Sequence, residues 1–313
     1  MSLSESEIKR NPHGNFKAVE ASRPAWDRAA GPRYTQTPSP SWTLGAGAND
    51  LAASDHDQSP PAHVAIDPYE DGRPRALNYK LLISAIVPRP IAFVSTRSAD
   101  GSTTNLAPFS YFQMIGSDPP LFVIGFACPL DRSGTAEGPS RSKDTLRNLL
   151  DTGECVVNII SEHFVEAANA GSADAPFGAS EWALGGLTPA YDCRDVRCAR
   201  VKEAVFSVEA KLESVREFES RAVPGRKTST MAIVEGTRFW VREDAINEER
   251  SIVDPAVLRP ISRLGGITYA RLMDMFELPR PNFEKDVGGQ EGYEKLEKER
   301  GGIDHPRATN GKA

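Results

Sequence analysis

The pattern of hydrophobic and polar positions predicts a chain built mainly from β-strands. Ile91–Thr96, Leu121–Ala127 and Glu154–Ile160 are apolar for most of their length, as in strands that are buried on both faces. Between the first two, Ser98–Gly101 reads Ser-Ala-Asp-Gly, and its Asp-Gly pair is typical of a tight hairpin turn. Thr103–Ala107 is therefore predicted to return antiparallel to the first strand.

Two later segments alternate between apolar and polar residues, which predicts strands with two unlike faces. In Val205–Val215 we expect one face to lie in water, and it consists of Ser207, Glu209, Lys211 and Glu213. In Thr228–Arg242 the more apolar face consists of Met231, Ile233, Thr237, Phe239 and Val241. The pair Pro224-Gly225 before this second segment is typical of a turn.

Short helices are expected between these strands. Asn78–Ala85 groups its apolar residues on one side, and Asp144–Leu150 is followed by Gly153, a residue that often ends a helix. Ser161–Ala170 is a third candidate, with Ser161 as its N-cap. Antiparallel strands joined by short helices indicate a mainly β fold, a barrel-like domain with peripheral helices, rather than a doubly wound sheet.

The two ends of the chain differ from this middle part. Residues 1–65 are rich in proline and polar residues and show no sustained helical or strand period, so we expect an N-terminal arm without a core of its own. Trp26 and Trp42 leave two alternatives open, an arm that is partly disordered or one that wraps the domain or a partner subunit. We assign residues 66–278 to the folded domain and residues 279–313 to a charged, glycine-rich C-terminal tail.

Composition excludes several classes of function. The 313 residues carry a formal charge of −6, and an acidic chain without long basic runs is a poor candidate for nucleic-acid binding. The first ten residues are polar, and the longest apolar run, Leu121–Ala127, is far shorter than the ~18 residues that span a bilayer. We therefore expect no membrane contact and a cytoplasmic location.

The four cysteines form no C-x-x-C pair and have no histidines at zinc spacing, so no metal site is expected. They are either reduced packing residues or, for Cys193 and Cys198, a redox pair. Only one of the five histidines, His163, falls in the predicted domain, and no hydrolase or P-loop motif is present. If the chain is an enzyme, its reactive group is expected to come from a cofactor.

A predicted helix start is the first candidate for ligand binding. Residues 141–145 read Arg-Ser-Lys-Asp-Thr, and the unpaired N–H groups and dipole of a helix start favour an anion. Lys143 and Arg141 would add charge, and Ser142 and Thr145 would add hydroxyl donors. Asp144 would repel an anion, so we expect its carboxylate to cap the backbone. The alternative is an ordinary capped surface helix.

A second candidate lies where the first predicted strands end. Ser95 and Thr96 end one strand, and Asn105 opens a polar segment that continues to Ser110 and Tyr111. Hydroxyl and amide groups at such a place can hydrogen-bond the edge of a planar heterocycle, and an aromatic ring can pack on its face. The alternative is that these polar groups satisfy a turn and that the aromatic residues belong to the core.

Five sequence segments, taken in order, resemble the flavin reductase-like FMN-binding split-barrel family. They are PRPIAFVST with ADG, NLAPFSYF with DPP, KDTLRNLLDTGECVVNI, GLTP and DPAVLRPISRLGGITYARL. The resemblance covers Tyr69 to Leu272 and includes neither the arm nor the tail. It implies a six-stranded antiparallel split barrel, in a homodimer with FMN at or near the subunit interface.

The resemblance also implies the residues that bind the cofactor. They are Ser95, Thr96, Asn105, Leu106, Ala107, Ser110, Tyr111, Arg141, Ser142, Lys143, Thr145 and Tyr269. The segment between Leu130 and Lys143 is longer than the family pattern, so either Arg132 or Arg141 could serve the phosphate side, and we favour Arg141 because it adjoins the helix start.

Three functions follow from the resemblance. The first is an FMN-dependent NAD(P)H oxidoreductase, which passes hydride through the flavin to free flavin or another small acceptor. The second is a flavin-dependent oxygenase or redox enzyme for a specific small molecule, with Phe177 and Trp182 in the loop at residues 171–189 supplying a pocket. The third is a non-catalytic flavin-binding module that uses the arm to dock a partner.

Overall fold

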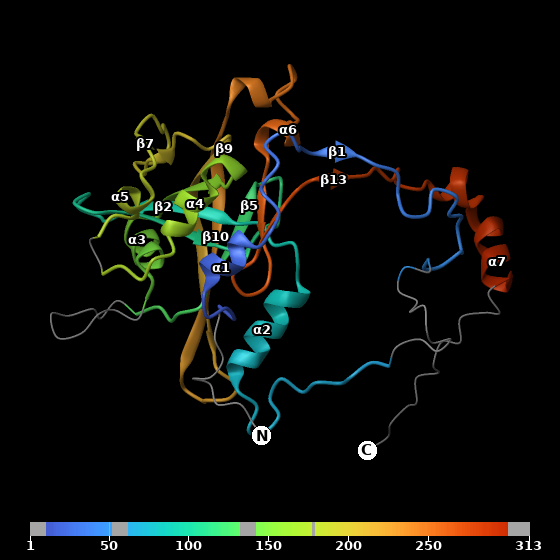
Figure 1. Cartoon of the computed structure of the whole chain (residues 1–313), viewed down its shortest axis with the longest axis horizontal. Helices are drawn as coiled ribbons and strands as arrows, with labels where there is room; N and C mark the ends of the chain where they lie inside the picture. Colours follow the sequence, from blue (N-terminus) through green and yellow to red (C-terminus); the bar gives the residue numbers. More distant parts are fainter. Residues whose placement is uncertain (1–10, 50, 52–61, 132–141, 177–178, 300–313) are drawn as a thin grey trace. The chain divides into compact units, whose positions relative to one another are not determined.

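The computed structural model describes residues 11–49, 51, 62–131, 142–176 and 179–299 (Figure 1). The chain divides into two compact units. The first combines the described parts of residues 1–32 and 66–273, and the second combines those of residues 33–65 and 274–313. None of the described helices is long and apolar enough to cross a membrane.

The first unit is built on one antiparallel sheet with the strand order β3-β2-β6-β9-β10-β5-β4. Its strands are β2 (Ala92–Arg97), β3 (Thr104–Phe109), β4 (Phe112–Met114), β5 (Leu121–Phe126), β6 (Glu154–Ile159), β9 (Phe206–Glu219) and β10 (Lys227–Val241). Two small two-stranded sheets accompany it, β7 (Pro189–Ala190) with β8 (Arg200–Val201) and β11 (Ile261–Arg263) with β12 (Tyr269–Arg271).

The main sheet has seven strands, so the expectation of six was wrong. The additional strand is β4, which the sequence pattern did not reveal. After β3 the chain bends at Ser110 and Tyr111 and then pairs with the edge of β5, with Phe112 opposite Ile124. Phe112 also stacks on Phe122 of β5, with ring centroids 6.0 Å apart, so burial of an aromatic ring holds this short strand in place.

Short helices cover the sheet and connect its strands. They are α2 (Arg75–Ala85), α3 (Asp144–Thr152), α4 (Val165–Ala170), α5 (Glu181–Gly185) and α6 (Pro255–Leu258), with 3-10 turns at Glu162–Phe164 and Glu243–Ala245. Helices α2 and α3 confirm two predicted helices, although α2 begins three residues earlier than expected. Ser161 precedes its 3-10 turn as predicted, but its side chain makes no capping hydrogen bond.

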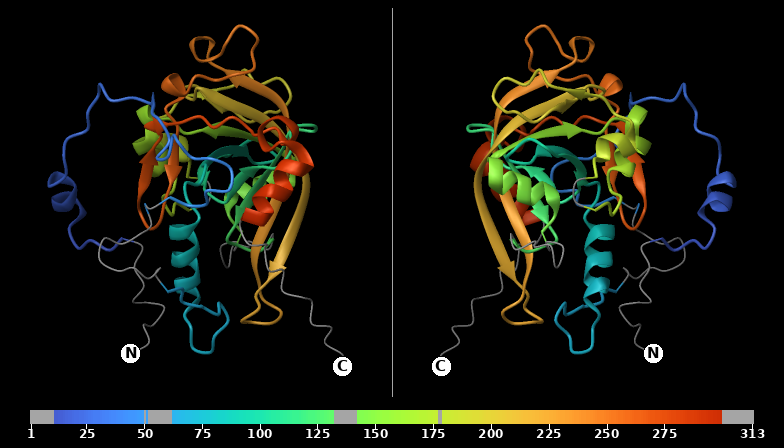
Figure 2. Two further views of the ribbon diagram at one scale, coloured as in Figure 1. Left: turned by 90° about the vertical axis from the view of Figure 1, so that its right-hand side faces the viewer. Right: turned by 90° about the vertical axis from the view of Figure 1, so that its left-hand side faces the viewer.

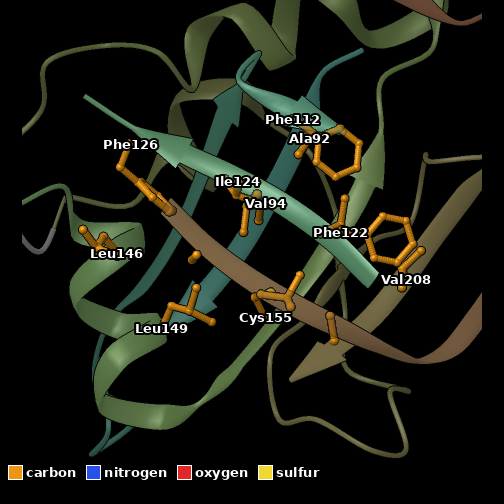
Figure 3. Close-up of a cluster of buried hydrophobic side chains, with 14 of the residues drawn as sticks. Ala92, Val94, Phe112, Phe122, Ile124, Phe126, Leu146, Leu149, Cys155 and Val208 are labelled. Carbon is orange, nitrogen blue, oxygen red and sulfur yellow. The ribbon is translucent and has the colours of Figure 1, made fainter. Parts of the chain in front are cut away.

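The sheet curls into a half-barrel around its main core. Strand β3 is one edge of the sheet and β5 lies next to the other edge, yet the rings of Phe109 on β3 and Phe126 on β5 meet with centroids 4.8 Å apart. Figure 3 shows how the core side chains from several strands converge with Leu146 and Leu149 of α3. The curl therefore brings the end of β5, the end of β3 and α3 to one region of the unit.

A second hydrophobic cluster packs outside the half-barrel. It joins Ile91 and Phe93 of the β2 region to Phe164 and Trp182. Trp182, which the second functional hypothesis named for a substrate pocket, is buried in this cluster. Phe177 lies outside the described residues.

The arm is attached to this unit through Glu162. Helix α1 (Phe16–Ala21) precedes Trp26, whose indole Nε1–H donates to Oε1 of Glu162 at 2.8 Å. Arg259 donates to Oε2 of Glu162 at 2.8 Å and to the carbonyl of Ala30 at 2.8 Å, and Arg271 also pairs with Glu162. Burial opposes ionisation of Glu162, but these hydrogen bonds together outweigh it and lower the pKa of the carboxyl.

The second unit contains few elements. Strand β1 (Arg33–Tyr34) pairs in parallel with β13 (Asp274–Met275), and Arg33 Nε donates to Oδ1 of Asp274 at 2.7 Å. A π-helical turn (Phe283–Val287) leads into α7 (Gly289–Glu299). Trp42 makes a local hydrogen bond to the carbonyl of Gly47 at 2.8 Å.

The faces of the two long strands differ from the expected ones. On β10 the buried residues are Thr230, Ala232, Val234 and Gly236, which is the opposite face from the one that looked more apolar. On β9 the polar face was predicted to lie in water, but Ser207 and Glu209 are fully buried. Only the second half of β9, from Lys211 onward, alternates with an exposed face.

The loop before β8 covers Glu209 and explains its burial. Its carboxylate accepts hydrogen bonds of 2.6–3.1 Å from the backbone N–H groups of residues 194–196 and one of 2.7 Å from Trp240 Nε1. Ser207 donates to the buried amide oxygen of Asn158 at 2.7 Å. A buried carboxylate is tolerated because each desolvated lone pair has a donor.

We expect Glu209→Gln to destabilise the protein by about 3 kcal/mol, because an amide group turns one set of backbone N–H donors into unsatisfied groups. The measurement is the free energy of unfolding in urea. Glu213→Gln, on the exposed part of the same strand, is the control and should change it by less than ~0.5 kcal/mol. Equal losses of unfolding free energy in both variants would show that the hydrogen bonds to Glu209 do not stabilise the fold.

Candidate functional site

A buried polar network joins β2, β3 and α3. Thr96 and Asn105 are opposite one another in the β2–β3 register. The Asn105 amide oxygen accepts a hydrogen bond from Thr145 Oγ1 at 2.6 Å and a longer one from Thr96 Oγ1 at 3.5 Å. Asn148 Nδ2 donates to Thr96 Oγ1 at 3.2 Å. All four side chains are buried, so the network fixes the position of the Asn105 amide.

The amide nitrogen of Asn105 forms no hydrogen bond with any residue that the structure describes, and this nitrogen is not completely enclosed by protein atoms. An amide held by its oxygen thus keeps a donor that a ligand can reach. Such a pre-positioned donor is a feature of a binding site rather than of a core residue whose groups are all satisfied.

The start of α3 is the second part of the site. Lys143 is the N-cap residue, it is exposed, and its side chain makes no capping hydrogen bond. Its own backbone N–H points to Sγ of Cys128 at 3.4 Å. Within the described residues, the N-cap side chain therefore does not satisfy the first-turn N–H groups of this nine-residue helix, whose positive dipole end favours an anion.

Asp144 does not cap the helix as the sequence suggested. Its carboxylate instead approaches Arg147 Nη2 at 3.7 Å, one turn along α3. Burial raises the pKa of Asp144, and the charges of Arg147 and Lys143 oppose that shift only in part. The carboxylate is thus partly neutralised by its neighbour, which reduces its repulsion of an anion at the helix start.

Ser142 has a structural role in the preceding loop. Its buried hydroxyl donates to the carbonyl of Pro129 at 2.6 Å and accepts from the N–H of Asp131 at 2.7 Å. This hydroxyl therefore fastens residues 129–131 to the start of α3. Arg141, the other predicted phosphate residue, lies outside the described residues.

The other predicted site residues on β2 and β3 lie beside the polar network. Ser95 is buried and lies opposite Leu106, and Ala107 lies opposite Val94. The N–H of Leu106 donates to Oε2 of the buried Glu181 at 3.2 Å. Glu181 begins α5, so this hydrogen bond fastens the free edge of β3.

Ser110 and Tyr111 form the bend between β3 and β4. Tyr111 is 43% exposed, and its carbonyl accepts the N–H of Gly125 at 2.7 Å. A Cβ at position 125 would lie 2.9 Å from Cβ of Tyr111, so glycine is required for β5 to pass this close to the bend. This close approach of β5 holds the backbone of Tyr111.

Tyr269 lies apart from the α3 network in this chain. Its hydroxyl donates to Oδ1 of Asn169 at 2.8 Å, and the Arg263 guanidinium lies 4.4 Å from its ring centroid. It packs against the second hydrophobic cluster. The structure therefore brings together Thr96, Asn105 and Thr145 but not Tyr269.

Sequence reasoning missed Asn148 and Glu181. Asn148 was within a predicted helix but looked like an ordinary surface position, and its buried donation to Thr96 depends on how α3 packs. No local sequence pattern marks Glu181, which lies in the predicted loop at residues 171–189. A weak signal existed for Asn148, since it lies one turn after Thr145 on the same face of α3.

Other candidate groups do not form a reactive centre. Burial raises the pKa of Cys193 to about 11 and that of Cys198 to about 12, with nearby carboxylates adding to both shifts, so these thiols are poor nucleophiles. His163 Nε2 lies 3.0 Å from the carbonyl of Glu203. The described residues contain no cluster of His, Cys, Asp and Glu that could hold a metal ion.

The geometry defines a class of protein that has a curled antiparallel half-barrel and a polar network beside a helix start. Comparison with known proteins gives the family. The flavin reductase like domain model matches residues 84–259, and the chain belongs to this flavin reductase-like, split-barrel family. An uncharacterized protein of Halalkalibacterium halodurans is 34% identical over 216 residues, which cover 69% of this chain and 97% of that protein.

Two solved structures are similar along most of their length. Nitrilotriacetate monooxygenase component B from Bacillus cereus has a TM-score of 0.61 at 34% identity, with 70% of this chain and 100% of that one covered. The 2-nitrobenzoate 2-nitroreductase of Pseudomonas fluorescens has a TM-score of 0.57 at 29% identity, with 71% and 98% covered. The family and these oxidoreductase relatives support a flavin-dependent oxidoreductase.

We expect Thr145→Val to weaken flavin binding, because it removes the shorter of the two hydrogen bonds that orient the Asn105 amide. A loss of about 1–2 kcal/mol would raise the Kd roughly five- to thirtyfold. The measurement is a flavin titration followed by fluorescence. Thr152→Val in the same helix removes local hydrogen bonds to Asn148 and Glu154 that lie outside the Asn105 network, so it is the control and should leave the Kd unchanged. Equal Kd values for Thr145→Val and wild type would exclude a role for this network in binding.

Proposed function

We propose that the protein is an FMN-dependent oxidoreductase that accepts electrons from NADH or NADPH and passes them to free flavin or another small acceptor. The observation that carries this proposal is the juxtaposition of two donors. One is the uncapped start of α3 beside Lys143, and the other is the Asn105 amide, which is joined to the same helix through Thr145. One suits a phosphate and the other suits the polar edge of a ring.

The residues present fit FMN. The proposed phosphate side consists of Lys143 and the first-turn N–H groups of α3, with Arg141 assigned there from the sequence alone. The proposed ring side consists of Ser95, Thr96, Asn105, Leu106, Ala107, Ser110 and Tyr111. Ser142 supports the phosphate side indirectly, by holding the loop that precedes α3. Tyr269 reaches this site only if it comes from a partner subunit.

A bound flavin would supply hydride chemistry at its N5 atom, which needs no acid, base or nucleophile from the protein. The chain's own residues then bind and orient. Asn105 donates to the ring edge from a position fixed by Thr96 and Thr145, and Lys143 holds the phosphate. Donors at Ser110 and the neighbouring backbone stabilise negative charge near the ring. This division of work agrees with the raised pKa values of Cys193 and Cys198.

The two similar solved structures are relevant to the choice of electron acceptor. One is named as a monooxygenase component and the other as a nitroreductase, so related chains serve different acceptors. Trp182 is buried in the second hydrophobic cluster, and Phe177 lies outside the described residues. We favour electron transfer to a small diffusing acceptor, with an oxygenase reaction on a specific small molecule as the alternative.

We also propose that the protein forms a homodimer. Large apolar side chains are exposed on and just after α2, where Leu82 is 54% and Ile86 is 61% exposed, and Met114 and Ile115 are 58% and 51% exposed. Apolar area of this kind is unfavourable in water and is typical of an interface. Sedimentation of Leu82→Glu should give a monomer where the wild type gives a dimer. A monomeric wild type would contradict the dimer.

The phosphate assignment can be tested with two ligands that differ only in that group. Lys143→Ala should weaken FMN binding about tenfold, since one charge-assisted contact is lost, and should leave riboflavin binding unchanged because riboflavin has no phosphate. The measurement is a flavin titration at low and high salt. Lys211→Ala on the exposed part of β9 is the control.

The activity is then measured with the flavin-loaded wild type. It should oxidise NADH or NADPH when free riboflavin or a ferric chelate is present as acceptor. Failure to retain FMN after desalting would remove the cofactor assignment. Retention without any oxidation of NADH or NADPH would leave a flavin protein but reject the reductase.

A further inference from the structure

The β9–β10 hairpin extends beyond the end of β5 and contacts the loop that follows β5. In Figures 1 and 2 the two long strands of this hairpin project past their neighbours. The last residue of β5, Phe126, lies opposite Thr230 of β10, and Thr230 lies opposite Glu217 of β9. Residues directly opposite one another on neighbouring strands direct their side chains to the same face of a sheet. Thr230 and Glu217 therefore face the same side as Phe126, the side of the main core.

Thr230 and Glu217 both bind the backbone of the loop after β5, residues 127–131. The buried hydroxyl of Thr230 donates to the carbonyl of Cys128 at 2.8 Å. Oε1 of Glu217 accepts the backbone N–H of Leu130 at 2.6 Å. Leu130 also packs against the main core. The hairpin thus holds this loop through two hydrogen bonds, one to an acceptor and one to a donor of the loop backbone.

The Glu217 carboxylate serves the loop and not an ion pair. Among the residues that the structure describes, it forms no ion pair with a cation, and its hydrogen-bond partner is the N–H of Leu130. A hydrogen bond from a backbone N–H to a charged carboxylate is stronger than one between two neutral groups. Glu217 therefore fixes the loop more firmly than a neutral side chain would.

The other side of the same loop is bound to the start of α3. Ser142 donates to the carbonyl of Pro129 at 2.6 Å and accepts the N–H of Asp131 at 2.7 Å. The next residue, Lys143, donates its backbone N–H to Sγ of Cys128 at 3.4 Å. Hydrogen bonds therefore lead from the hairpin through the loop to the helix start, and Cys128 takes part in both sets of contacts.

We propose that Glu217 is a positioning residue for the ligand site: it fixes the loop after β5 and, through this loop, the start of α3 that receives the flavin phosphate. The proposal rests on the function proposed above. Glu217 makes no hydrogen bond to a residue assigned to the ligand, so its effect passes through Leu130 and the loop. Its loss should affect the phosphate side and spare the ring side, because Thr145 and Asn105 are joined by a buried hydrogen bond of their own.

The test compares the binding of FMN with that of riboflavin, which has no phosphate. Glu217→Met keeps the length of the side chain but removes its acceptor oxygens, and it should weaken FMN binding about fivefold while riboflavin binding stays unchanged. Glu217→Gln keeps a carbonyl oxygen that can accept from Leu130, so it should bind FMN as the wild type does. Glu213→Met is the matched control, because Glu213 is exposed on the same strand and forms no hydrogen bond or ion pair with the described residues.

Three results would overturn the proposal. The first is equal FMN binding by Glu217→Met and the wild type. The second is an equal loss of FMN and riboflavin binding, which would show a general loss of stability rather than a displaced phosphate side. The third is a Glu217→Gln variant that binds FMN as weakly as Glu217→Met, because the accepted hydrogen bond would then not be the cause.

Hydrogen exchange of the flavin-free protein separates this proposal from the function proposed above. The backbone N–H groups of Lys143 and Arg147 donate to Cys128 and to the carbonyl of Lys143, and they should exchange faster in Glu217→Met than in Glu213→Met. Equal exchange rates in the two variants would overturn the positioning role. A wild type that binds neither FMN nor riboflavin would reject the proposed function, while the exchange rates would still decide whether Glu217 fixes the start of α3.

Discussion

The closure of the sheet on itself is the constraint on which the site depends. Phe109 on β3 packs against Phe126 on β5, although these strands are almost at opposite ends of the strand order. Burial of two aromatic rings supplies the free energy for this contact, and it fixes how far the half-barrel curls. The curl in turn places the end of β5 beside the start of α3. Without it, Cys128 would not meet Lys143.

Buried polar groups set the second constraint, because each must find a partner inside the fold. Asn105 and Thr145 come from segments forty residues apart, and their hydrogen bond satisfies both while it ties α3 to β3. The same rule operates at Glu209, which orders the loop before β8 through three backbone N–H groups. The two sites differ in one respect that matters for function. Glu209 has all its lone pairs engaged in structure, whereas Asn105 keeps an accessible donor.

Much of the fold could be predicted from the sequence, since local patterns determine local structure. The apolar runs gave β2, β5 and β6, and Asp-Gly marked the β2–β3 turn at Gly101, whose φ of 75° suits glycine. Alternation located β9 and β10 but not their environment. It tells which residues share a face, and it does not tell whether another segment covers that face. Glu209 was assigned to water for this reason, and β4 was missed because three residues are too few to show a period.

The sequence identified several residues of the candidate site, but it did not predict most of their contacts. Thr96, Asn105 and Thr145 were named from the sequence, and they do meet. Asn148 and Glu181 were not found, because a polar residue on a short helix looks the same whether it faces solvent or a strand. Ser142 was predicted on the phosphate side, and the structure adds that its hydroxyl holds the loop before α3. Such roles depend on packing between distant segments, which no local pattern encodes.

The distribution of charge bears on how an acidic protein could bind the proposed anionic ligand. The chain carries a formal charge of −6, which at a distance repels an anion. At physiological ionic strength that repulsion is screened beyond about 8 Å, so a ligand close to the surface responds mainly to nearby groups. At the proposed phosphate side those groups are Lys143 and the first-turn N–H groups of α3. Their attraction would act at contact distance, where screening is weak, and it would therefore decide affinity even though it contributes little to long-range steering.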